Sequence, residues 1–214
     1  MDEENKTQGE GKPSLDEALE MTRLMNIRMH APRVKVPRPE GFEPKPVPND
    51  PHSIFIYTNG PFILQLTGDG AIYSIQRGET FDDRIGKVIA SVKGFMSQNG
   101  MDDPDKNYFP YREIKNDQGI VFKTYINDSI FKAEDGKQKI VRAAIAFFLD
   151  EHPLDAGSPE HPVNPDLYQL TLSIGPFDYP MEQLVSGTVD AGDKVTASLL
   201  DLFEKILAKL SIGN

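Results

Sequence analysis

The chain has 214 residues, a formal net charge of −10 and no cysteine. Without cysteine it can form no disulfide, cysteine-ligated zinc site, iron–sulfur cluster or thiol nucleophile. The acidic balance argues against nucleic acid or an anionic membrane as a partner over a broad surface. The longest apolar run, residues 143–149, is too short to span a membrane, so we expect no transmembrane segment. The acidic start lacks the regions of a signal peptide, so we expect a soluble, cytoplasmic or otherwise intracellular protein.

Residues 1–51 are expected to form an N-terminal arm, and residues 52–214 one α+β globular domain. Ser14 and Glu17 have the spacing of a capping box, which predicts a short amphipathic helix over residues 15–29. The helix could fold back on its own domain, or it could dock on a partner or another copy of the chain. If the helix docks on a partner or another copy, the residues expected to bind it are Leu15, Leu19, Met21, Leu24, Met25 and Met29.

A proline-rich segment follows, with seven prolines in residues 32–51. This density predicts an extended polyproline-II spacer that would hold the helix away from the domain. Five basic residues cluster at the start of this segment. They could be part of a solvated linker, or they could contact phosphate or an acidic protein surface. The group consists of Arg28, His30, Arg33, Lys35 and Arg38.

The first half of the domain predicts three short strands and one long helix. The strands are expected over residues 53–57, 62–66 and 71–75, with a glycine turn at 67–70. Thr80 and Asp83 form a second capping box and should begin a helix that ends near Gly100 and covers the sheet. Its apolar residues recur in steps of three and four: Phe81, Ile85, Val88, Ile89, Val92, Phe95 and Met96.

The second half predicts a hairpin over residues 111–126, a strand over 168–174 and a helix over 190–210. Residues 138–149 fit a strand or a helix, and we favour a buried strand although three alanines favour a helix. The expected fold is therefore α+β, with a mainly antiparallel sheet of five to seven strands. Both long helices are expected on one face of this sheet. The last helix should bury a stripe of Val195, Leu199, Leu202, Phe203, Ile206, Leu207 and Leu210.

Chemistry-bearing motifs are scarce. Asp103, Asp105 and Asn107 have calcium-loop spacing, but Tyr108 and Ile114 occupy the positions that need glycine and glutamate, which favours a solvated acidic turn. The loop at 150–166 contains His152 and His161 among several acids and is the best place for a base or a metal ligand. The chain has no nucleophile elbow, HExxH, P-loop or Rossmann glycine pattern. We therefore predict no catalytic residue, metal site or cofactor, and no motif matches a family signature closely enough to name a family.

The first functional hypothesis is a non-catalytic interaction or assembly subunit. It would dock through its arm onto a protein partner or form a homo-oligomer, for example in a multi-subunit particle. One alternative is a small enzyme that uses His152 or His161 in the 150–166 loop. The other is an acidic inhibitor or immunity protein that neutralises a basic partner, because residues 52–214 carry a net charge of −8.

Overall fold

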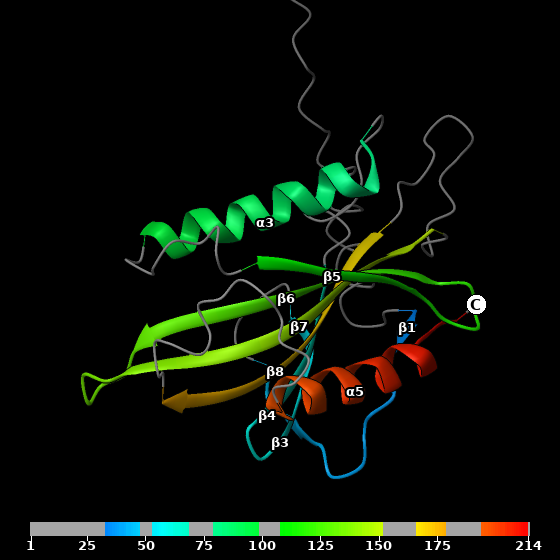
Figure 1. Cartoon of the computed structure of the whole chain (residues 1–214). Coiled ribbons are helices and arrows are strands. Elements are labelled where there is room, and N and C mark those ends of the chain that lie inside the picture. The colour runs from blue at the N-terminus through cyan, green and yellow to red at the C-terminus, as the bar shows by residue number, and fades with distance from the viewer. Residues whose placement is uncertain are drawn as a thin grey trace, which may run out of the picture.

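The computed structural model describes residues 33–47, 53–68, 79–98, 108–151, 166–178 and 194–213. These residues form an α+β fold with one seven-stranded antiparallel sheet and two long helices (Figure 1). The strands of the sheet follow the order β2-β3-β4-β8-β7-β6-β5, and a separate two-stranded ribbon pairs β1 with β9. The elements are β1 Val34–Lys35, β2 Glu43–Lys45, β3 Ser53–Asn59, β4 Phe62–Gly68, α3 Phe81–Gln98, β5 Tyr108–Lys115, β6 Val121–Lys132, β7 Gln138–Asp150, β8 Asp166–Asp178, α5 Lys194–Lys209 and β9 Ser211–Ile212.

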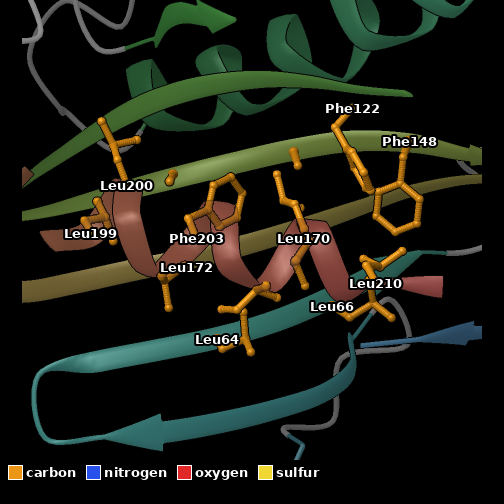
Figure 2. Packing of buried hydrophobic residues seen from close by; sticks show 14 of the residues in the cluster. Leu64, Leu66, Phe122, Phe148, Leu170, Leu172, Leu199, Leu200, Phe203 and Leu210 are labelled. Carbon is orange, nitrogen blue, oxygen red and sulfur yellow. The ribbon is translucent and has the colours of Figure 1, made fainter. Parts of the chain in front are cut away.

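The larger core lies between the sheet and α5. Leucines of β4 and β8 alternate with polar residues, so that one face of each strand is apolar. Figure 2 shows Leu64, Leu170 and Leu172 facing Leu199 and Phe203 of α5. Each fully buried side chain of this size contributes about 1.5–3 kcal/mol to folding. The predicted apolar stripe of the last helix is confirmed for its members from Leu199 to Leu210, which pack in this core. Its first member, Val195, is 37% exposed and does not belong to the core.

Strand β7 determines how the two helices are arranged. Its even-numbered residues Ala144, Ala146 and Phe148 belong to the α5 core. Its odd-numbered residues, among them Ile145 and Phe147, pack with Ile85 and Val88 of α3 in a second core. The helices therefore cover opposite faces of the sheet (Figure 1), and the expectation that they share one face is wrong. A strand that is apolar on both faces needs cover on both sides.

The remaining sequence predictions have mixed outcomes. Residues 138–149 form a strand, as favoured, and the predicted strands at 53–57, 62–66 and 168–174 lie within β3, β4 and β8. Strand β6 continues to Lys132 and is longer than expected. The predicted strand at 71–75 and the turn at 101–107 lie outside the described residues.

The proline-rich segment is not a free spacer where the structure describes it. Over residues 33–47 it forms β1, which pairs with β9, and β2, which pairs with β3. Val34 and Phe42 are both 5% exposed and belong to the α5 core. Burial of these two side chains and the strand pairing outweigh the local polyproline preference. The predicted domain boundary at residue 51 falls outside the described residues.

Helix α3 begins with the predicted capping box. Asp83 accepts hydrogen bonds from the Thr80 amide at 3.0 Å and the Thr80 hydroxyl at 2.6 Å. The Thr80 hydroxyl oxygen in turn accepts a hydrogen bond from the Asp83 amide at 3.1 Å. The hydrogen bond from the Thr80 side chain, followed by the one from its amide, lowers the pKa of Asp83 below its ordinary value of 3.8.

This lowered pKa predicts a pH-dependent contribution to stability. The contribution is complete above the unfolded pKa of about 3.8 and is lost as the pH falls through the lower folded value. Asp83→Asn should therefore be less stable than the unaltered chain at neutral pH, and the difference should shrink in acid. Urea unfolding at neutral and acid pH measures this difference for the unaltered chain and Asp83→Asn. Thr80→Val, which removes the hydroxyl donor to Asp83, is compared in the same way. An undiminished difference well below pH 3.8 would contradict the assignment.

Candidate functional site

The most distinctive polar site is the place where residue 33 joins the domain, which we call the arm root. It consists of Arg33, strands β1 and β9, and Asp150 at the end of β7. The Arg33 Nε donates a hydrogen bond to the Gly213 carbonyl oxygen at 2.7 Å, and the Gly213 amide donates to the Arg33 carbonyl oxygen at 2.9 Å. The Arg33 guanidinium also pairs with Asp150 at 3.5 Å. These contacts fix the position of Arg33, the first residue that the structure describes, on the domain.

Two carboxylates are buried at the arm root. Asp150 and Asp166 are directly opposite each other in the β7–β8 register, and both are 2% exposed. Directly opposite residues point to the same face of an antiparallel sheet. A buried carboxylate is costly unless a cation or hydrogen-bond donors surround it, and Arg33 supplies the positive charge for Asp150.

A hollow of about 320 Å³ opens beside the arm root. One part of its lining is polar, with Arg33, Asp150, Glu151 and Gln118. The other part is apolar and comes from four separate elements of the fold. The apolar side chains are Phe81 at the start of α3, Ile120 just before β6, Val121 at the start of β6, Leu149 of β7 and Ile212 of β9. Apolar and charged or polar side chains thus line the hollow in similar measure, which suits an apolar anchor side chain that has polar neighbours.

A second hollow, of about 370 Å³, lies between the β5–β6 turn and α5. Acidic and basic side chains alternate in its lining, where Lys115 and Lys205 lie among Asp117, Asp201 and Glu204. This mixture favours neither an anionic nor a cationic ligand.

The best-formed buried ion pair lies away from both hollows. Arg142 of β7 donates from Nε to Asp128 Oδ1 at 2.7 Å and from Nη2 to Oδ2 at 2.8 Å. Its Nη1 donates to the Thr196 hydroxyl at 2.6 Å, in the first turn of α5. The three residues are 8%, 4% and 0% exposed, so this network joins α5 to the sheet rather than facing a ligand.

Asn116 has a similar structural role at the other end of α5. Its Nδ2 donates to the carbonyl oxygens of Leu207 at 3.0 Å and Leu210 at 2.9 Å. Its Oδ1 accepts from the amides of Gln118 and Ile120, both at 3.1 Å. One side chain thus organises the β5–β6 turn and satisfies carbonyl groups that the end of a helix leaves without partners.

Tyrosines gather around the first part of the β5–β6 pair. Burial raises the pKa of Tyr108 to about 12, and burial also raises the pKa of Tyr125. Both pack with the α3 core, so they contribute packing and stay protonated at neutral pH. They offer no acid or base near pH 7.

The sequence-predicted site residues fall largely outside the described part of the chain. This holds for all six partner-binding residues, Leu15, Leu19, Met21, Leu24, Met25 and Met29, and for His152 and His161. Of the acids predicted near that histidine loop, Asp150 is buried at the arm root and Glu151 is exposed. Tyr108 and Ile114 of the rejected calcium pattern lie in β5.

Sequence reasoning missed both buried ion pairs. For Arg142 and Asp128 a signal was available, because each is a charged residue on the inward side of a strand among apolar neighbours. For Arg33 and Asp150 no local signal exists, since 117 positions separate them in the sequence.

Within the described residues, no three histidine, aspartate or glutamate side chains are grouped as they would be around a metal ion. No helix in that part of the chain is long and apolar enough to cross a membrane. A scan against models of protein families and a search of curated proteins both find no match to this chain.

Proposed function

We propose that this chain is a non-catalytic interaction or assembly subunit that docks through its N-terminal arm, and that a neighbouring copy of the chain receives the arm. The observation that carries the proposal is the arm root. Arg33 is held by Gly213 and Asp150, so the arm begins from a fixed point on the domain. A fixed origin reduces the conformational freedom that docking must remove, which favours binding.

Charge supports a second copy as the acceptor. Residues 28–51 carry five basic and three acidic groups, whereas residues 52–214 carry a net charge of −8. Lys35 and Arg38 are exposed at the start of this basic stretch. Residues 1–27 are acidic, with a net charge of −4, so the attraction between copies that we propose is limited to this basic stretch. It would meet the acidic remainder of a neighbouring domain and so favour a correctly oriented encounter.

The experiment compares the mass in solution of three full-length chains by size exclusion with light scattering. The unaltered chain should be an oligomer. Met21→Gln with Leu24→Gln removes two predicted docking side chains and keeps good helix formers. We expect its dissociation constant to rise at least about tenfold, because each buried interface side chain of this kind contributes roughly 1 kcal/mol or more.

The matched control is Asp16→Asn with Arg23→Gln, which changes two polar positions that lie outside the apolar sides of the same predicted helix and leaves the net charge unchanged. It should retain the oligomer. The proposal fails if the Met21→Gln, Leu24→Gln chain and the control have the same association constant.

A further inference from the structure

The hollow at the arm root is lined partly by apolar side chains and partly by Arg33, the first residue that the structure describes. Arg33 lines it, and residue 32 is bonded to Arg33. Any residue shortly before Arg33 is therefore close to the hollow. Four residues of fully extended chain span at most about 14 Å, so Met29 lies within that distance of Arg33 whatever its conformation.

The predicted helix has apolar residues on two sides. At about 100° per residue, Leu15, Leu19, Met25 and Met29 fall within roughly 120° of one another. Met21, Leu24 and Ile27 fall within a similar arc on the opposite side. A helix that is apolar on two sides can pack against its own domain with one side and present the other to a partner.

We propose that Met29 and Met25 of the predicted helix occupy the hollow of their own chain. The apolar part of the lining can contact the flexible, apolar methionine side chain; it consists of Phe81, Ile120, Val121, Leu149 and Ile212. A hollow of about 320 Å³ is at the small end of the range for ligand pockets, which suits one or two side chains rather than a whole helix. This intramolecular contact orients the arm and leaves Met21 and Leu24 outward.

The inference rests on the proposed function for the role of the outward side, but the contact itself can be tested separately. The chain has no cysteine, so introduced cysteines report on single pairs. Met29→Cys with Gln118→Cys places one thiol on the predicted helix and one on the exposed rim of the hollow. Under mild oxidation of dilute protein we expect an intramolecular disulfide, seen as a monomer of altered mobility on a non-reducing gel.

Two matched controls separate docking from simple proximity. Ile27→Cys with Gln118→Cys has a similar tether length, but its thiol lies on the opposite side of the helix, so its disulfide should form at least about tenfold more slowly. Met29→Cys with Lys137→Cys should form no intramolecular disulfide. Lys137 follows the far end of β6, and the 12 residues of that strand extend about 36 Å from Val121.

Several outcomes would overturn the inference. Equal rates for the Ile27→Cys and Met29→Cys chains, each paired with Gln118→Cys, would mean that only the tether brings the thiols to the hollow. Disulfide-linked dimers with Gln118→Cys would mean that a second copy fills it, and the absence of a disulfide would mean that the hollow is not the docking site. A fast intramolecular disulfide in a chain that light scattering shows to be monomeric would retain this inference and reject the proposed function.

Discussion

Replacing Arg142 alone by methionine is expected to lower the free energy of unfolding by about 3–5 kcal/mol, because Asp128 then stays buried without its counter-ion. Asp128 is 4% exposed and receives two hydrogen bonds from the guanidinium. The hydroxyl of Thr196 also loses the 2.6 Å hydrogen bond that it accepts from Arg142 and that joins α5 to β7. The amide hydrogens of the second turn of α5, which bond to carbonyl oxygens of the first turn, should therefore exchange faster than in the unaltered chain.

The matched variant replaces both charged residues, as Arg142→Met with Asp128→Leu. No charge is then left buried, so this chain should recover at least about 2 kcal/mol relative to Arg142→Met, although it contains one more substitution. Lys205→Met removes an exposed pair with Asp201 and should change stability by less than about 0.5 kcal/mol. Urea unfolding measures all three. An Arg142→Met chain as stable as Lys205→Met would show that the ion pair contributes little to the fold.

Replacing Asn116 by aspartate is expected to be the second most destabilising change, at about 2–4 kcal/mol at neutral pH. The side chain keeps its size but loses both donors to the carbonyl oxygens of Leu207 and Leu210. It also places a negative charge against the negative end of the helix dipole of α5. Because the site is 8% exposed, water cannot replace the lost hydrogen bonds fully.

Protonation of the new carboxyl group in acid should restore part of this loss, since a neutral acid can donate one hydrogen bond. Gln118→Glu is the matched control. It adds the same charge two residues away, on an exposed side chain, and should have little effect. Urea unfolding at neutral and acid pH distinguishes the two variants. Equal stabilities of Asn116→Asp and Gln118→Glu at neutral pH would contradict the role assigned to Asn116.

Periodicity and capping predict the elements whose signals are local. The helix at Phe81–Gln98 begins at the capping box of Thr80 and Asp83, and β8 shows the alternation expected for a strand with one apolar face. For β7 the strand interpretation is confirmed, and the strand is apolar on both faces. That character requires a helix on each side of the sheet, which the structure has.

The missed features depend on contacts between distant residues. Strand β6 extends beyond Ile126 because Asp128, which resembles a strand breaker locally, pairs with Arg142 of β7. Residues 33–47 have a polyproline composition, yet Val34 lies opposite Ile212 near the other end of the chain. The arm root depends on that pairing, so neither its position nor its hollow could be predicted from local sequence patterns.

The chain is proposed to assemble with other copies of itself through its arm. The most direct test is the mass of the unaltered full-length chain in solution, measured by light scattering over a range of concentrations and salt. We expect a mass above 23.9 kDa that falls towards this value as salt rises, because the basic stretch around Lys35 and Arg38 and the acidic remainder of a neighbouring domain attract one another. A mass of 23.9 kDa at every concentration would contradict it.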